Sequence, residues 1–147
     1  MHSFKELTAE LSSRFNTSHF PKQPQSLYAA NDYFLGLGGK RVRPVMCLMG
    51  NELFDEINAD AWQVAAAIEL FHNFTLIHVD IMDAAPLRRG LETVHYKFGS
   101  NTALLAGDVM LVVAYEYLNK ISSSYLKHII SIFSKTAKQV CEGQQLD

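Results

Sequence analysis

Residues 60–82 read as a single helix that is apolar on nearly every side. A surface helix carries one apolar stripe, whereas a helix that is apolar all round has to be buried by its neighbours. Pro86 lacks the amide hydrogen that a helix needs, so it ends or bends this segment. The chain therefore needs other elements packed around 60–82. The apolar positions are Ala65, Ile68, Leu70, Phe71, Phe74, Leu76 and Ile77.

The rest of the chain also favours helices, because its apolar residues recur at three- and four-residue spacing and almost never alternate. Pro21 and Pro24 mark a loop, and the glycines within 36–39 break a helix. We expect an all-α fold, an antiparallel helix bundle without repeats or linkers. The expected helices cover about 3–15, 26–35, 44–54, 60–82, 102–118 and 123–142, with a short segment at about 93–98.

Composition limits the partners and the compartment. The 147 residues carry a net charge of −2, which gives no reason to expect nucleic-acid binding. The N-terminus lacks the apolar core of a signal peptide, and Asp108 and Glu116 interrupt the apolar run 103–118. We therefore expect no stable membrane span. Cys47 and Cys141 lack the spacing of a zinc site, and we expect both to be buried free thiols in a cytoplasmic protein.

The carboxyl end of the helix at 60–82 carries two aspartates. At 100° per residue, His72, Val79 and Asp83 share one face, and Asp80 lies about 100° round from Val79. Paired carboxylates can hold Mg²⁺, a hard cation that completes its shell with substrate phosphates. Taken alone, D-x-x-D is more often an ordinary solvated helix end. A lone histidine such as His72 is likewise more often a satisfied core residue.

Two basic clusters point to an anion. Arg88 and Arg89 follow the acidic helix end, and paired guanidinium groups bind phosphate oxygens in a bidentate manner. The stretch GGKRVR at 38–43 places glycine NH groups and basic side chains at the start of a helix, which suits an anion. It is not a Walker P-loop, because Arg41 stands where that motif needs Ser or Thr. Alone, it would serve equally well as a glycine-broken turn with solvated basic side chains.

Together these pieces resemble the trans-isoprenyl (polyprenyl) diphosphate synthases. The matching motifs keep the family's order and spacing from residue 37 onward, which makes the match specific. The resemblance implies an all-helical bundle of the isoprenoid synthase type with a central cavity. It also implies that Mg²⁺ assists the departure of diphosphate as isopentenyl diphosphate condenses with an allylic diphosphate. The motifs are GGKRVRP at 38–44, ELFHNFTLIHVDIMD at 69–83, RRGLETVH at 88–95, LLAGD at 104–108 and GQQLD at 143–147.

The resemblance also implies roles for individual residues. Asp83, with Asp80 nearby, belongs to the first aspartate-rich motif, which carries Mg²⁺ and is catalytic. Arg88 would hold the allylic diphosphate. The residues that would hold isopentenyl diphosphate are Lys40, Arg43, His72 and Arg89.

Product length and assembly follow from the same resemblance. Phe74, followed by Thr75, precedes the aspartate-rich motif at the position where bulk closes the floor of the product tunnel. This implies a short product, from farnesyl to geranylgeranyl, although Phe74 would also make an ordinary core residue. Family members further imply a homodimer for the full-length protein.

The sequence departs from the family pattern in two ways. Val79 replaces the first aspartate of Asp-Asp-x-x-Asp at 79–83, and valine has no donor atom for a metal. We therefore expect activity to fall by orders of magnitude. Family members are also much longer, and their second aspartate-rich motif lies in the C-terminal half. We expect residues 1–147 to be the N-terminal part of a single polyprenyl synthase domain.

Three interpretations are open. The first is the N-terminal part of a short-chain prenyl diphosphate synthase, with impaired or no activity alone. The second is a non-catalytic homologous subunit or regulatory partner that keeps the helical interface and has lost the metal site. A terpene cyclase-like relative is third and does not explain GGKRVRP. The first is favoured because the diphosphate-binding residues Lys40, Arg43, His72, Arg88 and Arg89 are retained.

Overall fold

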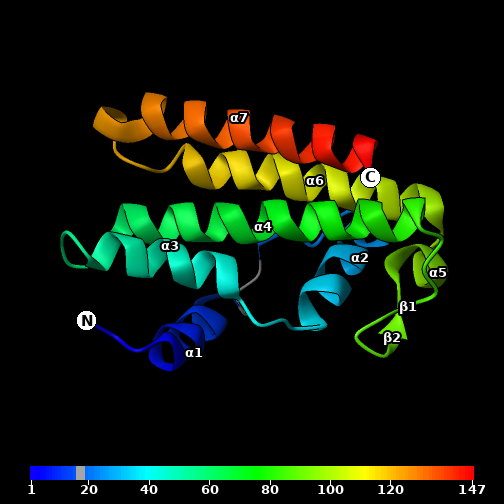
Figure 1. Cartoon of the computed structure of the whole chain (residues 1–147). Helices are drawn as coiled ribbons and strands as arrows, with labels where there is room; N and C mark the ends of the chain where they lie inside the picture. Colours follow the sequence, from blue (N-terminus) through cyan, green and yellow to red (C-terminus); the bar gives the residue numbers. More distant parts are fainter. Residues whose placement is uncertain (16–18) are drawn as a thin grey trace.

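The computed structural model describes residues 1–15 and 19–147 and has the all-helical fold that the sequence predicts (Figure 1). Each predicted helix is present, with ends that differ from the expected ones by a few residues. The elements are α1 Phe4–Phe15, α2 Gln25–Gly36, α3 Val42–Glu52, α4 Ala59–Met82, β1 Leu87–Arg88, β2 Leu91–Glu92, α5 Val94–Phe98, α6 Ser100–Leu118 and α7 Ser123–Leu146.

The long apolar helix α4 runs through the middle of the molecule. In Figure 1, α6 and α7 lie on one side of it and most of the shorter helices on the other. α6 runs antiparallel to both α4 and α7. Small residues let α4 and α6 approach closely: a Cβ at Gly107 of α6 would overlap the His78 ring of α4. His78 Nε2 also lies 3.1 Å from the Leu104 carbonyl oxygen, within hydrogen-bond distance.

Two hydrophobic clusters flank α4. The larger one joins α2, α4, α5 and α6, with Phe34, Leu70, Ile77, Met110 and Leu118 fully buried. The smaller one holds α1 and α3 against the first turns of α4. By length and composition, α4 is the one described helix that could span a membrane, and 44% of its apolar window is buried by its neighbours. Its position in this fold is that of a core helix.

A short hairpin between α4 and α5 was not predicted. Leu87 pairs with Glu92 and Arg88 with Leu91, across a two-residue turn. Both turn residues, Arg89 and Gly90, have positive φ, which is the backbone pattern of a type I′ turn. Two-residue strands are too short to show the alternation by which strands are recognised in sequence.

The two cysteines differ in exposure. Cys47 is half-buried in α3, whereas Cys141 is exposed in α7. The prediction that both are buried is therefore wrong for Cys141, because α7 buries none of its residues within this chain.

Candidate functional site

Four cationic side chains from three parts of the chain meet in one cavity. Its volume is about 440 Å³, and we call it the cationic cavity. The loop before α3 and the first turn of α3 supply one wall, α4 supplies another, and the hairpin supplies Arg89. The predicted binding residues for isopentenyl diphosphate are thus brought together. The lining residues are Gly39, Lys40, Arg41, Val42, Arg43, Glu69, His72 and Arg89.

The backbone of α3 adds to the positive character of this cavity. Arg41 caps the helix in a left-handed conformation, with φ of 51°, and no side chain caps the first NH groups. Uncapped NH groups and the helix dipole favour an anion at a helix N-terminus. Val42, the first residue of α3, lines the cavity. An anion there would meet backbone donors as well as cationic side chains.

A buried ion pair forms part of the lining of the cavity. The Arg41 guanidinium donates to the Glu69 carboxylate, and both side chains are less than a tenth exposed. Asn73 donates to Glu69 Oε1 at 3.1 Å, so the carboxylate has a second partner. The sequence-based prediction missed Arg41 and Glu69 as parts of the site. The available signal was Glu69 itself, a carboxylate inside an apolar helix that requires a buried cation.

His72 is neutral at its contact with Arg43. The two side chains meet at 3.1 Å between Arg43 Nη1 and His72 Nε2. Because a guanidinium only donates hydrogen bonds, His72 Nε2 must accept and carries no proton there. Burial, followed by the nearby charges of Arg43 and Arg89, holds the pKa of His72 below its ordinary value. The negative charge of a bound anion would raise the pKa of His72 again and would reduce the repulsion between the positive side chains. The cluster of positive charges therefore favours anion binding.

Arg89 reaches the cavity across a glycine. A Cβ on Gly39 would stand 3.1 Å from Arg89 Nη2, which is tighter than most real contacts. Burial and the neighbouring Arg88 and Arg41 charges lower the pKa of Arg89. Arg41 and Arg89 also both have left-handed backbones, a strained conformation that tends to gather at functional sites. The cavity therefore brings several positive charges close together, and the surrounding structure holds two of these arginines in left-handed backbone conformations.

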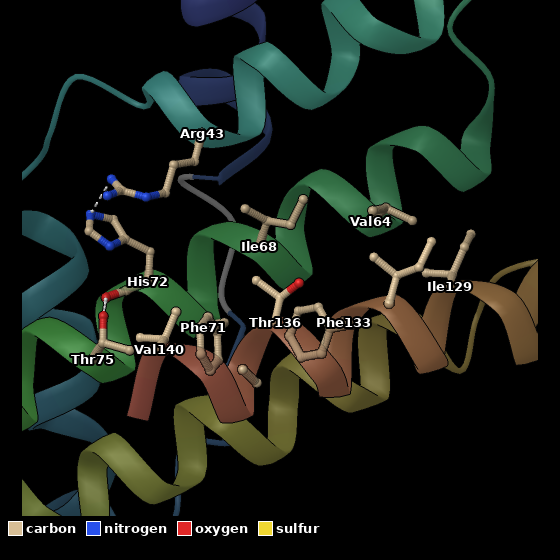
Figure 2. Close-up of a pocket in the computed structure, with 12 residues that line it drawn as sticks. Arg43, Val64, Ile68, Phe71, His72, Thr75, Ile129, Phe133, Thr136 and Val140 are labelled. Carbon is tan, nitrogen blue, oxygen red and sulfur yellow. Dashed lines mark hydrogen bonds between the residues drawn. The ribbon is translucent and has the colours of Figure 1, made fainter. Parts of the chain in front are cut away.

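An apolar groove adjoins the cationic cavity. It has a volume of about 470 Å³ and lies between α4 and α7, as Figure 2 shows. Arg43 and His72 line both spaces, so the groove begins where the cationic cavity ends. Its walls are mostly apolar, with Val64 and Ile68 from α4 and Ile129 from α7. A ligand with a charged head and an apolar tail fits this arrangement.

The acidic end of α4 is organised differently. Asp80 is buried and receives Arg88 in a bidentate pair, with Nε 2.8 Å from Oδ2 and Nη2 2.8 Å from Oδ1. Asp83 caps the helix and is exposed. Val79 offers no donor, and no group of three or more His, Cys, Asp or Glu in 1–15 and 19–147 could hold a metal ion. These residues alone do not make a complete magnesium site.

Phe74 and Thr75 line a third cavity, of about 390 Å³, together with Val79 and Met82. Thr75 also lines the apolar groove, whereas Phe74 does not. The aromatic side chains in the groove are instead Phe71 and, from α7, Phe133, which meet edge-on at 5.4 Å between ring centroids. Phe74 packs against His78, with ring centroids 4.7 Å apart.

Known proteins resemble this chain in sequence. A geranylgeranyl diphosphate synthase from Methanosarcina mazei is 41% identical over 127 residues, which are 85% of this chain and 39% of that protein. A geranylgeranyl pyrophosphate synthase from Geoglobus acetivorans is 44% identical over 129 residues, covering 86% of this chain and 40% of that protein. The chain therefore spans about two fifths of the length of the curated relatives it matches.

Solved structures agree with the sequence comparison. A geranylgeranyl pyrophosphate synthase superposes with a TM-score of 0.94 at 44% identity, covering 99% of this chain and 44% of that one. A polyprenyl synthase from Caulobacter crescentus, complexed with calcium and isoprenyl diphosphate, gives 0.82 at 27% identity, covering 98% and 45%. Residues 24–147 also match the sequence profile described as polyprenyl synthetase. The predicted resemblance is confirmed: the chain belongs to the polyprenyl synthetase family.

Proposed function

We propose that this chain provides the isopentenyl diphosphate site of a trans-prenyltransferase that makes short-chain isoprenoid diphosphates. The observation that carries the proposal is the cationic cavity, where Lys40, Arg43, His72 and Arg89 converge beside a helix N-terminus. A diphosphate needs several donors on one side, and guanidinium groups bind its oxygens in a bidentate manner. The adjoining apolar groove gives the hydrocarbon part of the substrate a dry surface.

The second substrate would be an allylic diphosphate, with Arg88 as a donor to it. Arg88 lies in the hairpin next to Arg89, and its guanidinium is bound to Asp80. Its side chain is 23% exposed, so it can reach an external anion. We infer a product from farnesyl to geranylgeranyl length, in keeping with the names of the relatives. Phe74 and Thr75 remain the proposed determinants of that length.

Mg²⁺ is the cofactor that the family implies. Asp83 is the exposed carboxylate that would offer it an oxygen ligand, and Asp80 could do so only by leaving Arg88. Val79 supplies no ligand, so Asp83 and Asp80 would be the carboxylates that hold the ion. We further propose a cytoplasmic location and a homodimer of the whole protein.

A second candidate function is favoured by the same valine. A non-catalytic subunit or regulatory partner of a prenyl diphosphate synthase would keep the cationic cavity and the helical surfaces while the metal site decays. Val79 and the Asp80–Arg88 pair are what such decay would leave. The two candidates make the same prediction for diphosphate binding and opposite predictions for turnover.

Calorimetric titration of the protein with isopentenyl diphosphate, without divalent metal, tests the site. We expect binding that weakens at least about tenfold in Arg43→Gln and in Arg89→Gln, since each loses a charge-assisted contact. Lys5→Gln, which removes an exposed cation from α1 outside the cavity lining, is the matched control. The proposal fails if Lys5→Gln weakens binding as much, or if sulfate binds as tightly as isopentenyl diphosphate.

A further inference from the structure

Arg89 lies at the turn of the hairpin, so its place in the cationic cavity depends on what holds the two strands. The turn residues Arg89 and Gly90 have left-handed backbones, and each strand has only two residues. A two-stranded hairpin on its own is marginally stable in water. The position of the Arg89 guanidinium is therefore set by contacts between the hairpin and the surrounding elements.

Buried groups fix the first strand and the base of the hairpin. Arg88 of β1 is bound in a bidentate manner by the buried Asp80 carboxylate. Thr93, fully buried just after β2, closes the base. Its hydroxyl donates to the Ala85 carbonyl oxygen at 2.7 Å, and its amide donates to the Pro86 carbonyl oxygen at 3.1 Å. These contacts hold β1 and the base but not the outer edge of β2.

The outer edge of β2 is held by Tyr33 of α2. In an antiparallel ladder, hydrogen-bonded pairs alternate with pairs that are not hydrogen-bonded. The base of the hairpin is a hydrogen-bonded pair, so the next pair, Leu87 and Glu92, is not. The Glu92 carbonyl oxygen therefore points away from β1, and the Tyr33 hydroxyl donates to it at 2.8 Å.

The ring of Tyr33 is itself fixed by α5. It meets Phe98 edge-on, with ring centroids 5.5 Å apart, and Lys97 Nζ lies 4.4 Å from its centroid. An edge-on aromatic neighbour and a cation over the ring both favour one orientation of the ring. Contacts other than the hydrogen bond to Glu92 therefore direct the hydroxyl toward β2.

Tyr33 also connects the hairpin to the opposite wall of the cationic cavity. It lies in the last turn of α2, which ends at Gly36, shortly before the loop that carries Lys40. Arg89 approaches the same loop, because a Cβ on Gly39 would stand 3.1 Å from Arg89 Nη2. A single side chain at the end of α2 thus links the two chain segments that supply cations to the cavity.

We propose that Tyr33 is a positioning residue for diphosphate binding, which keeps Arg89 within reach of an anion by holding β2 at Glu92. This inference rests on the proposed function, because it concerns the cationic cavity as a diphosphate site. Tyr33 does not line that cavity and brings no charge to it, so it acts through Arg89. Without its hydroxyl, Arg89 is in place in a smaller fraction of molecules, and the apparent affinity falls by that fraction.

A double-mutant cycle on the calorimetric binding of inorganic diphosphate, without divalent metal, tests the inference. We expect Tyr33→Phe, which keeps the ring, to weaken binding about fivefold through the loss of one hydrogen bond. In Arg89→Gln, already at least about tenfold weaker, Tyr33→Phe should add less than about twofold. In Arg43→Gln it should keep its full effect. Independent effects of Tyr33→Phe and Arg89→Gln would overturn the inference.

Tyr28→Phe is the matched control. Tyr28 also lies on α2 and stacks on Phe20, and its hydroxyl makes no hydrogen bond within residues 1–15 and 19–147. We expect this variant to bind diphosphate like the wild-type protein. A general loss of structure in Tyr33→Phe would weaken binding in the Arg89→Gln background as well, so the cycle separates positioning from stability. Circular dichroism checks that both variants keep the helical fold.

The outcomes also separate this inference from the proposed function. If Arg89→Gln leaves diphosphate binding unchanged, the proposed site is wrong and the role of Tyr33 is wrong with it. If Arg89→Gln weakens binding and Tyr33→Phe behaves like Tyr28→Phe, the diphosphate site stands and only the positioning role fails.

Discussion

α4 contributes to two charged regions that lie only a few residues apart along the helix: the cationic cavity, through Glu69 and His72, and the acidic end at 79–83. They differ in how many of the side chains needed for ligand binding are present and available. The cationic cavity has its predicted side chains, a helix N-terminus and a buried support. At the acidic end, Val79 offers no oxygen ligand and the Asp80 carboxylate is engaged by Arg88. The cationic cavity thus has charged groups available to a ligand, whereas the buried carboxylate at the acidic end is already paired within the protein.

The difference lies in which charges are neutralised within the protein. In the cationic cavity, the internal pair is Arg41–Glu69, and within the described residues Lys40, Arg43 and Arg89 have no carboxylate partner. At the acidic end, the internal pair Asp80–Arg88 uses a proposed metal ligand and a proposed diphosphate donor. The Arg41–Glu69 pair leaves the other cationic side chains of the cavity available to an anion. Asp80, by contrast, can take a metal ion only by giving up its contact with Arg88.

Restoring the missing carboxylate should produce the largest effect. Val79→Asp places an oxygen ligand one helical turn from Asp83, on the face where paired carboxylates can hold a divalent ion. We expect Mn²⁺ affinity, measured by electron paramagnetic resonance, to rise at least about tenfold. In a protein with the complete synthase length, turnover of labelled isopentenyl diphosphate should rise by orders of magnitude.

A change that adds no oxygen ligand provides the control for that result. Val79→Leu brings a side chain of about the size of aspartate without a donor atom and should leave Mn²⁺ binding unchanged. If the Val79→Asp variant and the wild-type protein turn over equally, the missing ligand does not limit catalysis and the acidic end of α4 is not impaired. If Val79→Asp binds Mn²⁺ and remains inactive, the non-catalytic subunit is the better interpretation.

Removing the support beneath the cationic cavity should have the next largest effect. Glu69→Gln leaves Arg41 buried without a counter-charge, and breaking a buried pair in this way costs about 3–5 kcal/mol. Urea unfolding measures the free energy, and isopentenyl diphosphate binding should weaken with it. Glu116→Gln, at an exposed position on α6, is the control and should change stability by less than about 0.5 kcal/mol. A similar small loss in Glu69→Gln would contradict the role given to this pair.

The sequence predicts the cationic cavity better than the acidic end, for a physical reason. Helical periodicity places His72 on the long apolar helix, and the glycine break places Lys40 and Arg43 at the start of another helix. The family motif adds Arg89. The direction of a side chain on a helix end is set by tertiary partners, so the turn of Asp80 toward Arg88 could not be read from spacing. The hairpin that delivers Arg88 was itself missed, because its strands are too short to show a period.

The burial of a residue is also hard to predict from sequence when it depends on which neighbouring helix covers that residue. α4 is predicted to be largely buried because it is apolar on nearly every side. Ala65, Leu70 and Ile77 are buried as predicted. The other apolar residues of the prediction are only partly buried, namely Ile68, Phe71, Phe74 and Leu76. Cys141 was expected inside because its neighbours are apolar, but α7 offers its apolar stripe to a groove and not to a filled core. Periodicity shows which face of a helix is apolar and says nothing about what covers it.

Adding a methyl group at Gly39 tests the position of Arg89 in the cationic cavity and should have a smaller effect than the two changes above. Gly39→Ala crowds Arg89, and its φ of +155° strains a residue that has a Cβ. We expect isopentenyl diphosphate binding to weaken several-fold, with a stability loss of about 1 kcal/mol. Gly36→Ala is the matched control, because nothing lies within 4 Å of the added Cβ and its φ is ordinary. Equal binding by the two variants would show that Arg89 does not need this close approach.

The smallest effect is a pH dependence that should belong to the cationic region. Burial and the Arg43 charge hold the pKa of His72 below its ordinary value, and burial does the same for His19. The unfolded chain therefore binds more protons than the folded one as pH falls below about 6.5. The contribution of these two histidines to the free energy of unfolding should be constant well above that pH. It should decrease below that pH until the pH reaches the lowered pKa values of the folded state.

Two additions assign this pH dependence to His72. In His72→Asn the decrease between about pH 7 and pH 5.5 should become smaller, while the part due to His19 remains. Inorganic diphosphate bound in the cationic cavity should raise the pKa of His72 and reduce the decrease in the wild-type protein but not in His72→Asn. If diphosphate reduces it equally in both, the anion acts elsewhere than beside His72. That result would remove the distinction between the two regions of α4, because the cationic cavity would no longer be the place where an anion and a proton are linked.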